Sequence, residues 1–405
     1  MNDLLAALSA AHFGAFTAHD AYDCGYHPRS LSQIVRGGQA LRVGPSAYVD
    51  RTRYENASPE GQHAMATRAV VRTFDGRVYA SHYSALSLMS LPMFGVPMDH
   101  IHVARVSDSL SRRRTGLSIH TEYGFGAGCL IGRTPSVSPA LAILGAAMTC
   151  GIETGVVAAD AALAAGTTTL NDLRTWLARL SRHPQVTHAR HVVQLADARS
   201  ESVGESRARL LLSALGFRPT PQVEIRNPAG KLVGRVDFLL KQKRVIVEFD
   251  GVMKYADAHG REALAAEKSR EDRLRALGYE FVRLTWADLS RPPTVERLMH
   301  QALARLRPPH NLTPNTVRPA LSPPSAGPSL FKHQRRCAIY DALALSRERR
   351  FVAARFGASG YAQHGTGGWA TGAGVQLVRS AGGRTGSLWA NWVCGVEGSL
   401  AGVTS

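Results

Sequence analysis

The fold of the C-terminal half is decided by the stretch Val245-Ile246-Val247-Glu248-Phe249-Asp250-Gly251. An apolar run that ends at a glycine predicts a buried β-strand followed by a turn. Side chains alternate along a strand, so Glu248 and Asp250 are expected on one face and Phe249 on the other. Asp237 lies in the preceding predicted strand, which would bring three carboxylates to one edge of a small sheet. Carboxylates held together on rigid strands repel one another unless a cation neutralises them, so the stretch predicts a divalent-metal site.

The segments on either side predict an α/β unit with a small mixed sheet. In chain order we expect a helix at Ser202–Leu215, strands at Gln222–Arg226, Gly234–Leu240 and Arg244–Asp250, a helix at Arg261–Leu277, a strand at Tyr279–Leu284 and a helix from Thr294. Lys254 follows the glycine turn, and Lys268 lies on the long helix, from which it can fold back over the carboxylates.

The charge of the chain suggests what such a metal would act on. The 405 residues carry a formal net charge of +17, with a pI near 10.2. Excess Lys and Arg favours a polyanionic partner, because these side chains displace counterions from phosphates. General use of Arg on the surface is the alternative explanation. A divalent metal would neutralise a phosphodiester and lower the pKa of a bound water, and Mg²⁺ (or Mn²⁺) suits oxygen ligands.

These residues resemble the PD-(D/E)XK nuclease superfamily, and within it the Vsr-like (very-short-patch-repair-like) endonuclease domain, over about residues 200–305. The matching positions are Asp237, Glu248-Phe249-Asp250-Gly251, Lys254-Tyr255, Lys268-x-Arg270-x-Asp272-x-Leu274, Gly278 and Arg283. The resemblance implies catalytic roles for Asp237, Glu248, Asp250, Lys254 and Lys268, and metal ligation by Asp237, Glu248, Asp250 and Glu205, the acidic residue of the helix before the sheet. One departure matters: Asp250 stands where the superfamily has its lysine. Either Lys254 or Lys268 takes over that role, or the domain is inactive and only binds.

Residues 2–50 predict three short helices and a small β-hairpin, which is the layout of a winged helix-turn-helix. The helices are expected at Leu4–Ala11, at Ala18–Cys24 with Thr17 as N-cap and at Arg29–Arg36, and the strands at Leu41–Val43 and Ala47–Val49. Leu31, Ile34 and Val35 are expected to pack inward. The predicted DNA contacts are Arg29, Ser30, Ser32, Gln33, Arg36 and, at the base of the wing, Arg42. A small helical domain with solvated arginines, or one that binds protein, is the alternative.

The first 130 or so residues resemble the N-terminal part of AbiEi-type antitoxins, the repressor half of type IV toxin–antitoxin systems. The matching residues are Phe16-Thr17, the helix at Arg29–Arg36, Leu41-Arg42-Val43-x-x-x-Ala47-Tyr48 and Ser81-His82-Tyr83-Ser84-Ala85-Leu86. The resemblance implies DNA binding and, as a partner, a nucleotidyltransferase-like toxin or its operator. We interpret His82 as a core or capping residue, because no Cys or Asp partner is spaced for a metal.

The whole chain is expected to be a multidomain α+β protein, similar to actinobacterial-type proteins that join these two parts. We expect a winged helix-turn-helix at 1–55, an α+β connecting domain at 56–198, the α/β restriction-endonuclease-like domain at 199–306 and a Pro/Gly-rich, low-complexity, mostly disordered tail at 307–405. In the connecting domain the expected helices are Pro59–Phe74, Ser81–Leu91, Pro139–Cys150, Gly151–Ala164 and Thr169–Leu180, and the expected strands are His100–Arg105 and Leu117–His120. Arg112–Arg114 is expected in a loop, and the domain offers no defensible site.

Other classes of protein are disfavoured. Five scattered cysteines without a CxxC pair indicate neither a zinc knuckle nor a disulfide framework, and free thiols suit a reducing cytoplasm. The N-terminus has no basic region before a long apolar run, so it does not predict a signal peptide, and no segment predicts a membrane span.

Two functions from different classes follow. One is a metal-dependent DNA endonuclease guided by a winged helix. The other is an antitoxin-like repressor whose nuclease-like domain has lost activity and binds DNA or a partner. Cleavage of RNA stays open, because the same metal chemistry acts on either backbone.

Overall fold

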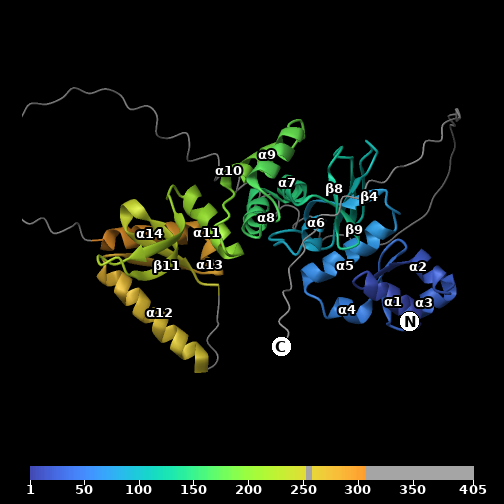
Figure 1. Ribbon diagram of the computed structural model, residues 1–405, viewed down its shortest axis with the longest axis horizontal. Coiled ribbons are helices and arrows are strands. Elements are labelled where there is room, and N and C mark those ends of the chain that lie inside the picture. The colour runs from blue at the N-terminus through green and yellow to red at the C-terminus, as the bar shows by residue number, and fades with distance from the viewer. Residues whose placement is uncertain (252–257, 307–405) are drawn as a thin grey trace, which may run out of the picture. The chain divides into compact units, whose positions relative to one another are not determined.

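The computed structural model describes residues 1–251 and 258–306, with the side chains of Gln242 and of residues 258–265 excepted. The expected disordered tail at 307–405 therefore lies outside the described residues. Over the described part the chain is a mixed α+β protein with three sheets (Figure 1). None of the described helices combines the length and the apolar character needed to cross a bilayer.

The N-terminal elements match the predicted helices and hairpin and add one strand. They are α1 (Asp3–Ala11), β1 (Ala15–Thr17), α2 (Ala18–Asp23), α3 (Pro28–Arg36), β2 (Ala40–Gly44) and β3 (Ala47–Asp50). The missed strand, β1, pairs antiparallel with β3 and completes a sheet of order β1-β3-β2. Thr17 caps α2 as predicted, in a capping box with Asp20. Leu5, Phe16 and Leu31 are buried beneath the helices.

The central elements include a six-stranded sheet of order β6-β7-β5-β4-β9-β8. They are α4 (Arg51–Glu55), α5 (Pro59–Arg72), β4 (Val78–Ala80), α6 (His82–Leu88), β5 (Ile101–Arg105), β6 (Arg112–Arg114), β7 (Leu117–His120), β8 (Gly128–Ile131), β9 (Thr134–Val137), α7 (Pro139–Cys150), α8 (Ile152–Ala164), α9 (Leu170–Arg179) and α10 (Val186–Leu195). α7 is apolar on all sides and almost entirely buried, which is the pattern of a helix inside a core.

The prediction of a loop at Arg112–Arg114 is wrong. These residues form β6, an edge strand that pairs antiparallel with β7. Gly116, with φ of 72°, lies in the turn between the two strands. All three arginines are exposed, and long charged side chains are a common way to protect a sheet edge from pairing with other chains.

The C-terminal elements follow the predicted order. They are α11 (Val203–Ala214), β10 (Thr220–Arg226), β11 (Leu232–Leu240), the 3-10 helix η1 (Lys241–Lys243), β12 (Val245–Phe249), α12 (Ala258–Ala276), β13 (Glu280–Leu284), α13 (Trp286–Leu289) and α14 (Pro292–Arg305). The sheet order is β10-β11-β12-β13, with two antiparallel pairings followed by the parallel pairing of β12 with β13. A parallel pair needs a long crossover, and the segment that contains α12 supplies it.

Each face of this sheet carries its own apolar cluster. On one face Phe238, Val247 and Leu284 pack with residues of α11 and α14 such as Leu212 and Met299 (Figure 1). The second cluster contains Ile246 and Phe281 of the sheet, together with Leu274 of α12. β12 is therefore buried on both faces, which explains its continuous apolar run.

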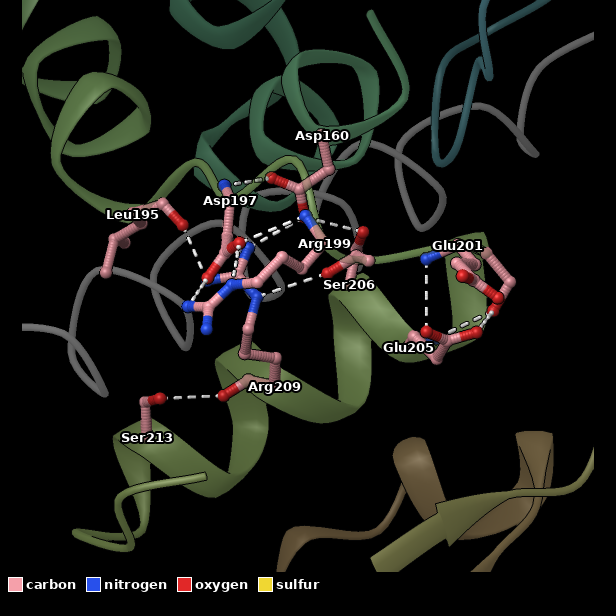
Figure 2. A network of polar contacts seen from close by, with 11 residues as sticks. Asp160, Leu195, Asp197, Arg199, Glu201, Glu205, Ser206, Arg209 and Ser213 are labelled. Atoms are coloured by element: carbon pink, nitrogen blue, oxygen red, sulfur yellow. Dashed lines mark hydrogen bonds and ion pairs between the residues drawn. The ribbon is translucent and has the colours of Figure 1, made fainter. Parts of the chain in front are cut away.

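A buried ion pair ties α11 to α8 (Figure 2). Arg209 Nη2 donates to Asp160 Oδ2 at 2.7 Å, and both side chains are at most 9% exposed. Ser206 Oγ and the backbone N–H of Asp197 each donate to the Asp160 carboxylate at 2.7 Å. Arg209 also donates to the carbonyl of Leu195 at 2.6 Å. The buried charges are thus matched by hydrogen bonds, as buried ion pairs require.

Candidate functional site

The sheet brings Asp237 and Glu248 side by side. Phe238 pairs with Val247, so the next residue pair outward is Asp237 on β11 with Glu248 on β12. Both carboxylates line one cavity with residues of α12. The Phe249 ring packs with the apolar cluster of α11 and α14 on the other face of β12, although the residue also borders the cavity, and it meets the Trp286 ring edge-on at 5.0 Å between ring centroids. The predicted alternation along this strand is confirmed.

Asp237 is a carboxyl group with a perturbed environment. The backbone N–H of Phe249 donates to its Oδ2 at 2.8 Å. Burial, helped by the negative charges of Glu205 and Glu248, raises the pKa of Asp237 to about 6. Because the ionised form of Asp237 is disfavoured, a cation placed beside it would stabilise the carboxylate. Perturbed carboxyl groups in clefts are a common mark of functional sites.

Glu248 is buried and ion-paired with two arginines. Arg270 of α12 donates to Oε1 at 2.7 Å, and Arg283 of β13 lies 3.6 Å from Oε2. Arg283 also pairs with Glu267 at 2.7 Å and Glu271 at 3.0 Å. The sequence did not predict that two arginines pair with Glu248, although Arg270 and Arg283 are both among the positions that match the nuclease superfamily.

The cavity itself has a volume of about 660 Å³. Among the described residues, those lining it are Asp237, Glu248, Phe249, Asp250, Glu267, Lys268, Arg270, Glu271, Asp272 and Arg283. Six carboxylates thus face three basic side chains, in a chain whose overall charge is +17. The local charge favours a cation and is opposite in sign to the molecule as a whole.

Not every predicted site residue reaches this cavity. Asp250 and Lys268 line it, whereas Lys254 lies outside the described residues. Glu205 is not a lining residue. Its carboxylate accepts from the backbone N–H of Glu201 at 3.0 Å, from Ser202 Oγ at 2.9 Å and from Gln222 Nε2 at 2.8 Å. These bonds place it at the start of α11, from where it acts on Asp237 by charge.

The predicted DNA contacts form an exposed surface on α3. Arg29, Ser32, Gln33 and Arg36 are exposed, as is Arg42 on β2. Leu31 is buried, and Ile34 and Val35 pack partly buried against the same cluster, so the predicted inward face is confirmed.

Some of these side chains have local partners. Ser30 Oγ accepts from the backbone N–H of His27 at 2.8 Å, and Ser32 Oγ donates to the carbonyl of Pro28 at 2.8 Å. Arg42 Nε donates to the carbonyl of Gly44 at 3.2 Å.

The structure also holds a histidine cluster that sequence reasoning missed. Among the described residues, one group of three or more His, Cys, Asp or Glu has ligand atoms that all lie within 4.8 Å of one another. The group is His82, His102 and His120, rather than the predicted carboxylates. Its members are spread over 39 positions of the sequence, so spacing alone gives no signal. The parallel register of β5 and β7, which pairs Ala104 with His120, brings His102 and His120 together, and His82 comes from the start of α6.

Comparison with known proteins gives distant relatives. No protein-family model matches the chain. It is 27% identical over 184 residues to two Mycobacterium tuberculosis proteins, the uncharacterized protein MT2308 of strain CDC 1551 / Oshkosh and the uncharacterized protein Rv2248 of strain ATCC 25618 / H37Rv. The matched span is 45% of this chain and 66% of each relative, just under two thirds of their length. Neither name states an activity.

Proposed function

We propose that residues 199–306 form a PD-(D/E)XK-type nuclease domain that hydrolyses DNA phosphodiester bonds with Mg²⁺ or Mn²⁺. The observation that carries this proposal is the pairing of Asp237 with Glu248 in an acidic cavity of a strongly basic chain. The element order α11-β10-β11-β12-α12-β13 supports it, because it follows the order of helices and strands predicted from the sequence for the nuclease-like unit.

The donor set fits a hard divalent ion. Asp237, Glu248 and Asp250 offer carboxylate oxygens, which magnesium prefers, and Asp237 is already destabilised as a bare anion. When bound, the metal would neutralise the scissile phosphate and lower the pKa of an attacking water.

The protein's own cations would assist. Lys268 lines the cavity where a phosphate would lie, and Arg270 and Arg283 hold Glu248 in place. These positive charges would stabilise the charge that develops on the phosphate during cleavage.

The N-terminal residues would hold the duplex. The order α1-β1-α2-α3-β2-β3, with α3 exposing Arg29 and Arg36, supports a winged helix whose α3 enters the major groove. DNA would then be both the bound partner and the substrate, as expected from the net charge.

A second function, an antitoxin-like repressor with an inactive nuclease-like domain, is favoured by a specific observation. Both oxygens of Glu248 already face arginines, and the three carboxylates do not form a compact ligand group in the described part of the chain. With Asp250 in place of the superfamily's lysine, the domain would bind DNA or a nucleotidyltransferase-like toxin without cutting.

One assay separates the two functions. Supercoiled plasmid is incubated with the full chain, with Mg²⁺, with Mn²⁺ or with chelator, beside Asp237→Asn and Glu248→Gln. Glu224→Gln is the matched control, because Glu224 is an exposed carboxylate on the same sheet that pairs with Arg226 and does not line the cavity. The nuclease proposal expects metal-dependent nicking that both cavity variants lose and the control keeps.

Equal conversion by all variants would show a contaminating nuclease and overturn the proposal. An absence of conversion, with duplex binding retained in a gel-shift experiment, would favour the repressor. A gene for a nucleotidyltransferase-like protein directly downstream would point the same way.

A further inference from the structure

Three imidazole rings converge at the central six-stranded sheet, and none of them lines the carboxylate cavity. His82 is the first residue of α6, His102 lies in β5 and His120 ends β7. Nδ1 of His102 lies 2.8 Å from Nε2 of His120. The rings of His82 and His120 have centroids 3.9 Å apart, and those of His102 and His120 are 5.1 Å apart.

The cluster is largely buried. His82 and His102 are 2% and 4% exposed, and His120 is partly exposed. The 2.8 Å contact between His102 Nδ1 and His120 Nε2 joins two ring nitrogens, one of which carries the hydrogen while the other accepts it. A neutral imidazole keeps one ring nitrogen without a proton, and such nitrogens are metal ligands.

The protein holds His82 in an unusual position. Its backbone has φ of 53°, in the left-handed region that non-glycine residues rarely adopt. Ser81 Oγ lies 2.7 Å from His82 Nδ1, a partner of the kind that fixes the ring of a metal-binding histidine. α7 also approaches the ring so closely that a Cβ on Gly145 would stand 3.0 Å from His82 Cγ. The hydrogen bond from Ser81 and the close packing of α7 thus both restrict the ring.

We propose that His82, His102 and His120 bind a divalent transition-metal ion of the zinc class. Three neutral nitrogens suit zinc, cobalt, nickel or copper far better than magnesium or calcium, which prefer oxygen. Three protein ligands leave the fourth tetrahedral position to a water. The partly exposed His120 provides the side from which the ion enters.

The movement required of the His102–His120 pair is small. Two nitrogens at about 2.0–2.1 Å from a tetrahedral zinc lie about 3.3 Å apart. His102 and His120 would separate by about 0.5 Å from their 2.8 Å contact. The proton between them would move to the other nitrogen of its own ring, so both rings stay neutral. The ion would then link α6, β5 and β7, which pack together in the core.

The test uses tag-free full-length chain, stripped with chelator and dialysed. Zn²⁺ is titrated by calorimetry, Co²⁺ by its visible absorption, and bound zinc is counted by mass spectrometry. We expect one zinc per chain at this site, an intense tetrahedral Co²⁺ spectrum and a higher thermal midpoint with zinc. His102→Gln and His120→Gln should each weaken Zn²⁺ binding by at least about tenfold, since even outer-shell changes cost 10–100-fold.

The controls separate this site from others. His100→Gln should leave zinc binding unchanged, because His100 lies beside the cluster with its Nε2 bonded to Ser118 Oγ at 2.8 Å. Asp237→Asn should also leave it unchanged, so the outcome does not depend on the nuclease proposal. A zinc X-ray absorption spectrum of the unaltered chain counts imidazole ligands without any substitution.

Three results would overturn the proposal. Zinc binding that survives both glutamine variants would place the ion elsewhere. An absorption spectrum without imidazole scattering would do the same. No zinc binding and no change in the thermal midpoint would leave a hydrogen-bonded histidine cluster only.

Discussion

Replacing Asp237 with asparagine should stabilise the β10–β13 sheet at neutral pH and, under the proposed nuclease function, abolish metal-dependent cleavage. The folded protein raises the pKa of this carboxyl from 3.8 to about 6, mainly by burial. The ionised form is therefore disfavoured in the folded state. Asparagine carries no charge and keeps an oxygen that can accept the Phe249 N–H, which lies 2.8 Å from Asp237 Oδ2.

The magnitude follows from the pKa. A tenfold change in an acid dissociation constant corresponds to about 1.4 kcal/mol, so a pKa near 6 sets an upper bound of ~3 kcal/mol. The side chain is partly exposed, and solvent screening reduces the gain to about 1–2 kcal/mol.

The sign depends on pH. Below about 3.8 both folded and unfolded chains are protonated at Asp237, so Asp237→Asn changes little. As pH rises through about 6 the folded parent ionises at Asp237 and its free energy of unfolding falls, whereas that of the variant does not. The stabilisation of the variant relative to the parent is therefore complete at pH 7.5 and nearly absent at pH 4.

The assay must report on this sheet alone, since a chain with several cores need not unfold in one step. Hydrogen exchange followed by mass spectrometry does so, through peptides covering β11 and β12. At pH 7.5 these peptides should exchange roughly 5- to 30-fold more slowly in the variant, which corresponds to about 1–2 kcal/mol. Glu224 is an exposed carboxylate on β10, so the control variant Glu224→Gln should change the exchange rate of these peptides little. Faster exchange in Asp237→Asn, or an equal gain at pH 4, would refute the reasoning.

Three further changes test other parts of the structure. Asp160→Asn should lower the free energy of unfolding by about 3–5 kcal/mol, because it leaves the buried Arg209 without its anion. The double variant Asp160→Leu with Arg209→Met should lose much less stability, because it removes both charges. Equal losses in thermal denaturation would contradict this account. Gly204→Ala should destabilise the chain by about 1–3 kcal/mol, since its Cβ would stand 1.9 Å from Phe249 Cε1, and an unchanged thermal midpoint would exclude that close approach. Arg29→Ala with Arg36→Ala should weaken duplex binding for all sequences and reduce the salt slope by about 2, as seen by fluorescence anisotropy, without changing Mn²⁺ affinity; unaltered DNA binding would remove α3 from the interface.

Elements built from local sequence patterns were predictable. The alternation at Glu248, Phe249 and Asp250 placed two carboxylates and one packed ring correctly, because strand geometry fixes which side each residue faces. Thr17 correctly predicted the start of α2, because the two residues of a capping box are only three positions apart. The pattern of apolar runs likewise located β11, β12, α12 and β13 within a few residues.

Features that depend on distant pairing were not predictable. β1 is three residues long and exists because β3 pairs with it, 30 or so positions later. The Arg270–Glu248 contact depends on how α12 packs over the sheet, which no local pattern specifies. The histidine cluster requires the parallel register of β5 and β7 and the left-handed backbone at His82.

Under the proposed nuclease function, the distribution of charge would link metal and DNA binding at the carboxylate cavity. A cavity with six carboxylates and three basic side chains repels a phosphodiester, although the chain as a whole attracts one. Without a cation, DNA would be held by exposed arginines such as those on α3 and kept out of the cavity. A divalent ion reverses the local field, so metal and DNA should enter together rather than independently. On this reasoning the affinity of the cavity for Mn²⁺ rises when duplex DNA is bound, by the same factor with which Mn²⁺ strengthens DNA binding. A binding-only domain, in which Arg270 and Arg283 keep both oxygens of Glu248, would show no such coupling.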